Sequence, residues 1–176
     1  GFQFSTYPVA HPGLEQKATW LQIGRQLRPD WVFMWGWGVM NSTAIKEAAA
    51  VGFPMEKFIG VWWSGAEADV TPAGDAAKGY KSLNITGVGT SAPIFKAIEK
   101  MHADGNGVAD KANIGTVLYN RALVNAFYYT EAIRIAQAEF GVKPLTGEQI
   151  QWGMERLDIT QDMIDKAGMT GLMSPV

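Results

Sequence analysis

Two short apolar runs, each of which ends in tryptophan and glycine, constrain the fold of this chain most strongly. Residues 31–38 read Trp-Val-Phe-Met-Trp-Gly-Trp-Gly, and residues 58–65 read Phe-Ile-Gly-Val-Trp-Trp-Ser-Gly. Residues 42–51, which lie between the two runs, have helical character and are followed by Gly52. A strand, a helix and a second strand in this order are typical of two parallel strands joined by a crossover helix. The sequence therefore predicts an α/β fold.

Tryptophans are concentrated at the ends of these two runs. The chain has seven tryptophans in 176 residues, and five of them fall between positions 31 and 63. Ligands of open α/β sheets bind beyond the carboxyl ends of the strands. We therefore expect the tryptophans at the strand ends to border a cleft: Trp35, Trp37, Trp62 and Trp63. Trp31, which begins the first run, is predicted to be a core residue, because helices cover both faces of a parallel sheet.

Composition excludes several classes of function. The chain has no cysteine, which excludes disulfides and thiolate zinc sites, and its net charge of −2 gives no indication of a nucleic-acid surface. His11 and His102 have no companions at metal-ligand spacing, so we expect no metal site. No apolar run reaches the roughly 18 residues of a membrane span. The chain begins with Gly1 and shows no signal-peptide pattern, so we expect a mature or trimmed product.

The segments around the two runs complete the predicted first half. Alternating polarity predicts a strand over residues 1–7, and apolar spacing predicts a helix that begins at Pro12 and ends before Pro29. A short helix over residues 71–79 and a strand over residues 80–86 follow the second run. The first half therefore has the predicted order βαβαβαβ.

Residues 87–91 are glycine-rich and mark a predicted boundary, beyond which the chain changes character. The sequence there predicts helices without strands, over residues 93–102, 114–140, 146–157 and 160–167. The longest of these helices is apolar over a broad arc and needs a covering surface. Because the sequence offers no second sheet, we infer that part of the fold lies outside this chain.

Four stretches, in this order, resemble the type I periplasmic binding proteins of ABC importers, and in particular the branched-chain amino-acid-binding branch. The first stretch is Pro-Asp-Trp-Val-Phe-Met-Trp-Gly at residues 29–36. The second, at residues 44–60, contains Ala-Ile-Lys-Glu-Ala-Ala-Ala-Val-Gly and then Lys-Phe-Ile-Gly. Ala-Gly-Asp-Ala-Ala-Lys-Gly-Tyr at residues 73–80 and the helix over residues 119–136 complete the set. No single stretch is a sharp motif, but their order and spacing cover nearly the whole chain.

The resemblance implies a three-layer αβα lobe with a mostly parallel sheet, the type I periplasmic binding protein fold. Residues 1–86 would form most of the second lobe, without its opening strand and helix. Residues 87–91 would be the hinge or crossover, and residues 92–176 would be helices that return to the first lobe, whose sheet is not in this chain. A missing N-terminal portion of the same protein, or a second copy, would complete the fold.

The same resemblance implies a solute-binding protein that is not an enzyme and has no cofactor. Such a protein is secreted to the periplasm through a signal peptide, which is not present in this chain. It holds a small molecule between its lobes and delivers it to the membrane permease of an ABC importer, and nucleic acid is not an expected partner.

The ligand of this chain is expected to differ from a plain amino acid. In amino-acid-binding members of the family, a tyrosine after the first matching strand and an acidic residue past the next strand hold the ligand's ammonium group. Trp35 to Trp37 and Trp62 stand at these positions, with Glu67 nearby. This departure favours a small hydrophobic or aromatic carboxylate, or an amino-acid-like ligand.

Each candidate residue also has a plainer explanation. A buried tryptophan covers about 150–250 Å², so packing alone justifies the tryptophans. Asn41 or Ser42 is suited to cap the crossover helix, although the free N–H groups at a helix start also bind carboxylates. Ser64 and Glu67 follow the second strand and are ordinary loop residues unless a ligand meets them. Tyr7 faces the cleft only if the first predicted strand is parallel to the others.

Two other functions stay open at this point. The chain could be the ligand-sensing domain of a receptor or regulator with the same fold, or an α/β enzyme whose catalytic residues lie outside it. It contains no Gly-x-Ser-x-Gly elbow, no His-Glu-x-x-His and no cysteine nucleophile. The Gly-x-Gly sequences at residues 36–38 and 87–89 lack the Lys-Ser/Thr of a phosphate loop.

Overall fold

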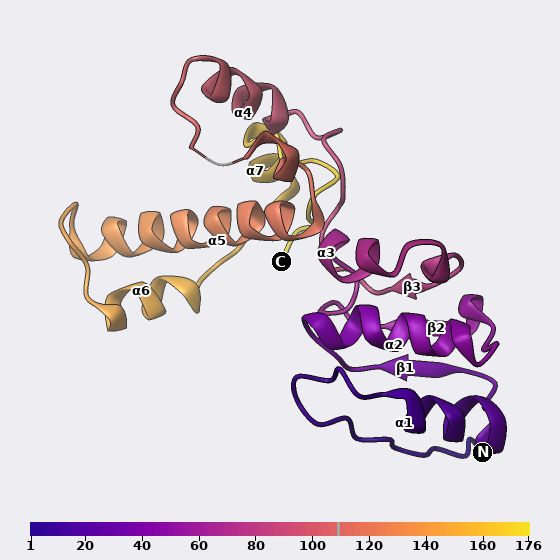
Figure 1. Ribbon diagram of the computed structural model, residues 1–176. Helices are drawn as coiled ribbons and strands as arrows, with labels where there is room; N and C mark the ends of the chain where they lie inside the picture. The colour runs from indigo at the N-terminus through magenta and orange to yellow at the C-terminus, as the bar shows by residue number, and fades with distance from the viewer. Residues whose placement is uncertain (109) are drawn as a thin grey trace. The chain divides into compact units, whose positions relative to one another are not determined.

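The computed structural model describes residues 1–108 and 110–176, which form two compact units (Figure 1). The first unit comprises Gly1–Asn84 and the second Ile85–Val176. Each unit has its own cluster of buried hydrophobic residues. The hinge expected at residues 87–91 stays a prediction.

The first unit is built on a parallel three-stranded sheet. Its strands are β1 (Val32–Met34), β2 (Phe58–Gly60) and β3 (Lys81–Ser82), in the spatial order β1-β2-β3. The chain passes from β1 to β2 through α2 (Val39–Ala50), so the predicted crossover is confirmed. β3 is shorter than the predicted strand over residues 80–86, although the Leu83 amide still donates to the Gly60 carbonyl (2.9 Å).

α2 begins earlier than the sequence predicts. Gly38 has φ 60° and ψ −144°, a conformation that favours glycine, and it turns the chain directly into the helix at Val39. Asn41 and Ser42 therefore lie inside the first turn, and the prediction that one of them caps the helix is wrong. At the other end, Gly52 follows the helix with φ 75°, as predicted.

The chain before β1 differs most from the sequence prediction. The predicted strand over residues 1–7 is wrong, because this segment has no regular structure and no strand pairs with it. The helix predicted from Pro12 begins only at α1 (Lys17–Leu21), which continues as the π-helix η1 (Gln22–Leu27). Arg28, with φ 49°, ends it before Pro29 as expected.

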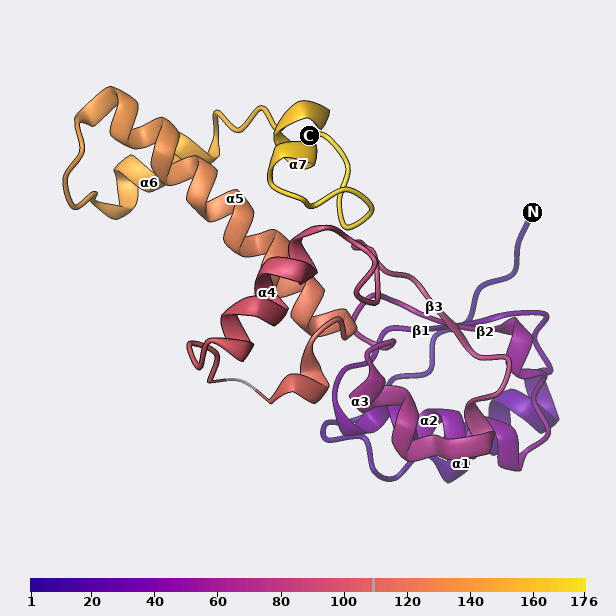
Figure 2. The same ribbon diagram turned by 90° about the horizontal axis from the view of Figure 1, so that it is seen from above.

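The core of the first unit is rich in aromatic residues and lies between the helices and one face of the sheet. The Trp20 ring centroid is 4.9 Å from that of Phe58, which in turn is 5.0 Å from that of Tyr80. Figure 2 shows α1, α2 and α3 (Glu67–Val70) on the same side of the strands. Two 3-10 helices, η2 (Met55–Lys57) and η3 (Thr71–Ala77), complete the unit.

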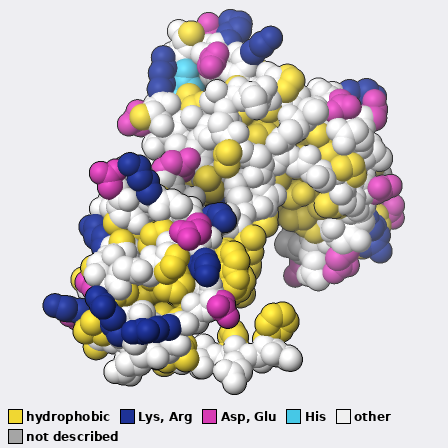
Figure 3. Space-filling view, turned by 90° about the vertical axis from the view of Figure 1, so that its right-hand side faces the viewer, with side chains coloured by type: hydrophobic (Ala, Val, Ile, Leu, Met, Phe, Trp, Pro, Cys, Tyr) yellow, Lys and Arg dark blue, Asp and Glu magenta, His cyan; other side chains and the backbone are white. Residues whose placement is uncertain are grey.

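The opposite face of the sheet is open to solvent in this unit. Trp31 is 49 % exposed and Phe33 is 65 % exposed, so the prediction that Trp31 is a core residue is wrong. The physical reason is that no helix among the described residues of the unit covers this face. The space-filling view shows hydrophobic side chains at the surface between charged ones (Figure 3).

The described part of the second unit contains helices and no named strand, as the sequence predicts. These elements are α4 (Ile94–Ala103), η4 (Lys111–Asn113), α5 (Val117–Phe140), α6 (Gly147–Met154) and α7 (Gln161–Lys166). The side chain of Thr116 caps α5, and Thr146 with Gln149 forms the predicted capping box of α6. Among residues 1–108 and 110–176, no helix has the length and hydropathy needed to cross a membrane.

Gly87 and Gly89 are hydrogen-bonded inside the second unit. Asn120, which is fully buried on α5, donates through Nδ2 to the carbonyls of both glycines at 3.0 Å. The Gly87 amide donates to Leu172 and the Gly89 amide to Gly115, each at 2.9 Å. This glycine-rich segment is therefore hydrogen-bonded to α5 and to two other segments of its own unit.

Candidate functional site

Four tryptophans from the ends of two adjacent strands form one cluster of aromatic rings. The Trp35 centroid lies 5.4 Å from that of Trp62 and 6.4 Å from that of Trp63. Trp63 is also 6.2 Å from Trp37 and 5.3 Å from Trp62. Most of these pairs are edge-to-face, the arrangement that aromatic rings prefer. Trp35, Trp37 and Trp63 remain exposed, so their rings are accessible to a ligand.

Hydrogen bonds from buried side chains hold the two tryptophan-bearing loops together. Asn41 donates through Nδ2 to the Trp63 carbonyl (2.9 Å), and Ser64 donates through Oγ to the Gly36 carbonyl (2.8 Å). The Tyr80 hydroxyl donates to the Ser64 carbonyl (2.7 Å). Each loop is thus bonded to the other, and the second loop is also bonded to the segment before β3. These hydrogen bonds from Asn41, Ser64 and Tyr80 fix the backbone from which the rings project.

Asn41 and Ser64 are placed differently from the tryptophans. Both side chains are 0 % exposed, and both donate to backbone carbonyls. A Cβ on Gly36 would lie 2.5 Å from Asn41 Oδ1, so a glycine is needed where the first loop passes over Asn41. Asn41 and Ser64 are therefore buried residues that hold the backbone of the two tryptophan-bearing loops.

Burial raises the pKa of Tyr80 well above its ordinary value of 10.0, and the negative charge of Asp69 raises that pKa further. In the unfolded chain the phenol ionises near pH 10, whereas in the folded chain it stays neutral. The neutral Tyr80 thus contributes stability that is fully present below about pH 10 and is lost as pH rises beyond it.

We expect the free energy of unfolding to fall above about pH 10, and to fall less steeply in Tyr80→Phe, which has no phenol to ionise. Urea denaturation of both proteins at neutral and alkaline pH measures the two slopes. Lysine side chains titrate in the same pH range. Because both proteins contain the same lysines, the lysine contribution cancels when the two slopes are compared. If the free energy of unfolding fell equally with pH in the two proteins, this account of Tyr80 would be contradicted.

The other two candidate residues, Glu67 and Tyr7, are not members of the ring pairs given above. Glu67 is exposed and begins α3, whose Asp69 accepts a hydrogen bond from the Ala66 amide (3.1 Å). Tyr7 is partly buried and packs against the hydrophobic core of the unit.

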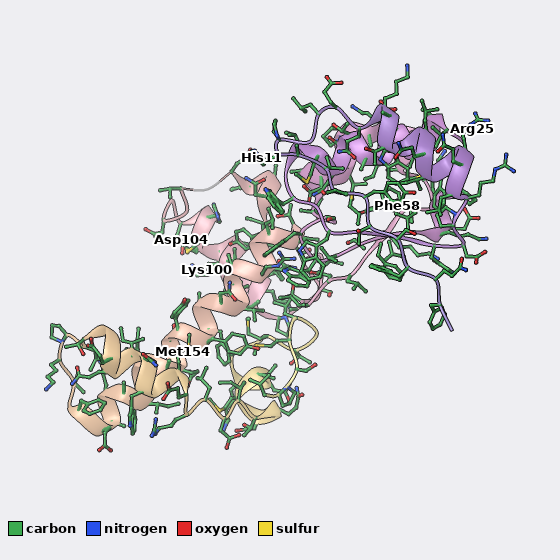
Figure 4. All side chains as sticks on the ribbon, turned by 90° about the horizontal axis from the view of Figure 1, so that it is seen from below. His11, Arg25, Phe58, Lys100, Asp104 and Met154 are labelled. Carbon is green, nitrogen blue, oxygen red and sulfur yellow. The ribbon has the colours of Figure 1, made fainter. Side chains whose placement is uncertain are left out.

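Sequence reasoning missed three residues that shape this edge of the sheet: His11, Gln16 and Tyr80. The His11 ring is stacked on Trp37, with centroids 6.3 Å apart and an interplanar angle of 26°. Gln16 is buried and fixes the loop that carries His11. In Figure 4, His11 lies at one end of the unit and Arg25 at the other, with Phe58 between them. No local pattern in the sequence predicts the contact between His11 and Trp37, because the two residues are 26 positions apart.

Acidic and histidine side chains do not gather into a metal-binding group. Among residues 1–108 and 110–176, no set of three or more His, Asp or Glu side chains could hold a metal ion. The chemistry that the ring cluster offers is instead aromatic contact and hydrogen bonding from indole and imidazole N–H groups. These features define an α/β lobe with an exposed cluster of aromatic rings at the carboxyl ends of its parallel strands.

Comparisons with known proteins identify the family. The family model described as "Periplasmic binding protein" matches residues 1–172, and the chain therefore belongs to the periplasmic binding proteins. Its type I α/β fold, with a parallel sheet, is the one that the sequence resemblance implied. None of the curated proteins matches the chain.

Three solved structures resemble the chain. A protein of the Pseudomonas fluorescens group, described as an ABC transporter permease, is 44 % identical with a TM-score of 0.85, over 96 % of this chain and 41 % of that one. A branched-chain amino-acid ABC transporter protein from Thermus thermophilus, crystallised with valine, is 21 % identical with a TM-score of 0.63, over 84 % of this chain and 37 % of that one. An ABC transporter substrate-binding protein from Aeropyrum pernix is 16 % identical with a TM-score of 0.64, over 91 % and 40 %. The last two likenesses concern the fold alone, and the chain spans about two fifths of the length of all three.

Proposed function

We propose that this chain is part of an extracytoplasmic solute-binding protein that serves an ABC importer and is located in the periplasm. The observation that carries the proposal is the assembly of Trp35, Trp37, Trp62 and Trp63 into an accessible ring cluster at the carboxyl ends of β1 and β2. This is the edge at which open α/β sheets bind ligands. Membership of the periplasmic binding proteins, and likeness to a substrate-binding protein of an ABC transporter, support the same function.

The proposed ligand is a small hydrophobic or aromatic carboxylate, or an amino-acid-like molecule. Tryptophan rings offer large, rigid apolar surfaces that gain from stacking and from removal of water. In this proposal the tryptophans contact the ligand, and Asn41 and Ser64 act as positioning residues through the Trp63 and Gly36 carbonyls. Glu67 and Tyr7 remain proposed ligand contacts.

The proposed mechanism is closure of two lobes around the ligand. Residues 1–86 would contribute one wall of the cleft, residues 87–91 the hinge, and residues 92–176 helices of the other lobe. The remaining sheet would come from a further portion of the same protein or from a second copy. Closure requires the ligand to bind the closed state more tightly than the open state, and the importer's permease would recognise the closed state. The activity is capture and release, without chemical change of the ligand.

The experiment that tests the proposal is isothermal titration calorimetry of the complete protein encoded by the gene, with valine, phenylalanine and benzoate as probes. Trp62→Ala and Trp35→Ala are each expected to weaken binding of the best probe about 30-fold or more, as for the dominant contacts of other binding sites. Because the Trp35 ring is exposed, we expect Trp35→Ala to disturb folding less than Trp62→Ala does.

Trp31→Ala is the matched control, because it removes the same side chain from an exposed position of the first run that has no ring contact in the cluster. It should leave probe affinity within about twofold of wild type. Loss of stability with unchanged affinity in both cluster variants would contradict the proposed site. Turnover of a bound probe would contradict the proposed function.

A further inference from the structure

His11 extends the ring cluster with a side chain that can carry a positive charge. Its imidazole is stacked on the indole of Trp37 and is exposed to solvent. The stacked pair therefore places an imidazole N–H donor beside the indole of Trp37. The four tryptophans themselves offer only neutral donors.

The loop that carries His11 is fixed against the start of α2. A Cβ on Gly13, which has φ 78°, would lie 2.3 Å from Met40 Cβ, so only glycine permits this close approach. Gln16 donates through Nε2 to the carbonyls of Gly13 (2.7 Å) and Met40 (2.8 Å). The Trp20 indole donates in turn to Gln16 Oε1 (3.2 Å). Buried contacts thus hold the His11 loop beside the first tryptophan loop.

The charges in the neighbouring loops give His11 a distinct chemical role. Residues 35–40 and 61–66, which carry the cluster, contain no Lys, Arg or His, and the charged residues that follow are Glu67 and Asp69. Indole N–H groups donate to a carboxylate and to a neutral amide alike. A protonated imidazole adds a charge-assisted hydrogen bond that only the carboxylate receives in full.

We propose that His11 is a ligand-contacting residue that makes the cluster prefer a carboxylate attached to a planar or apolar ring over its neutral counterpart. This inference rests on the proposed function, because it assumes that the tryptophan cluster binds the ligand. In the bound state, the ring of the ligand packs on the indoles, and its carboxylate accepts a hydrogen bond from the His11 imidazole.

The test measures the affinities of benzoate and benzamide for the complete protein by calorimetry at about pH 6. The two probes share a ring and differ in charge. Wild type is expected to bind benzoate more tightly, and His11→Phe, which keeps an aromatic ring on Trp37, should reduce the benzoate-to-benzamide affinity ratio about tenfold. His11→Gln, which keeps a neutral donor, should give an intermediate ratio.

Four results would overturn the inference. An unchanged ratio in His11→Phe would show that His11 does not select the carboxylate, while the solute-binding function would stand. Tighter binding of benzyltrimethylammonium than of benzoate by wild type would show that the cluster selects a cation. Binding of valine with no binding of either benzene probe would overturn the inference of a ring-bearing carboxylate and keep the solute-binding function. If wild type bound none of these probes, both the inference and the proposed site would be rejected.

Discussion

A Gly60→Ala variant is expected to have a free energy of unfolding about 2–4 kcal/mol below that of wild type, because a new side chain would overpack a buried site and break a hydrogen bond. An added Cβ at this position of β2 would lie 1.9 Å from the Tyr80 hydroxyl oxygen and 2.7 Å from Ser64 Cβ. The Tyr80 hydroxyl would have to leave the Ser64 carbonyl that it now contacts at 2.7 Å. Urea denaturation of wild type and variant measures the loss.

The Gly60 prediction has a rescue test. Tyr80→Phe removes the oxygen that the new methyl group would meet first, so the double variant should be more stable than the sum of the single losses predicts. The ring itself still constrains the site, since Tyr80 Cζ lies 3.0 Å from the added Cβ, and rescue should be partial. If the stability losses of Gly60→Ala and Tyr80→Phe were strictly additive, contact with the Tyr80 hydroxyl would not be the cause of the Gly60→Ala loss.

A Gly153→Ala variant is expected to lose about 2–3 kcal/mol of stability in the second unit. α6 crosses α5 so closely at Gly153 that an added Cβ would lie 2.2 Å from the Ala132 carbonyl oxygen and 3.2 Å from Ala136 Cβ. The carbonyl belongs to the backbone of α5, so it is α6 that has to move. That movement would weaken the packing of Trp152 on Phe140, whose ring centroids are now 5.2 Å apart.

Gly147→Ala is the matched control within the same helix. An added Cβ at Gly147 would meet nothing within 4 Å, and alanine has the better helix propensity, so this variant should be as stable as wild type or more stable by up to about 1 kcal/mol. Thermal unfolding of both variants separates close packing from a general effect of the substitution. Equal losses at the two positions would contradict the close approach of the helices.

Local patterns predict the crossover unit of this protein well. Apolar runs and turn residues predict the parallel β1–β2 pair, the intervening α2 and the glycine that follows α2. The helices of the second unit were also readable, because capping residues such as Thr146 act over a single turn. Assembly of the tryptophans followed from the rule that the carboxyl ends of parallel strands meet at one edge.

The remaining features depend on partners that are distant in the sequence. Trp31 has a core-like pattern, yet its burial depends on what covers its face of the sheet. Residues 1–7 alternate like a strand, but a strand exists only where another strand pairs with it. Asn41 and Ser64 act through carbonyls 22 and 28 residues away, and neither pairing leaves a local signal.

The edge-to-face packing of the tryptophans has an optical consequence. Indole rings with centroids 5.3–6.4 Å apart couple their electronic transitions, so we expect Trp35, Trp62 and Trp63 to give exciton-split circular dichroism. The second unit has a single tryptophan, Trp152, which lies under the Arg156 guanidinium at 4.0 Å. Trp152→Phe would leave all indole emission and exciton circular dichroism in the first unit. The exciton circular dichroism of these rings is thus a label-free reporter at the edge where ligand binding is proposed.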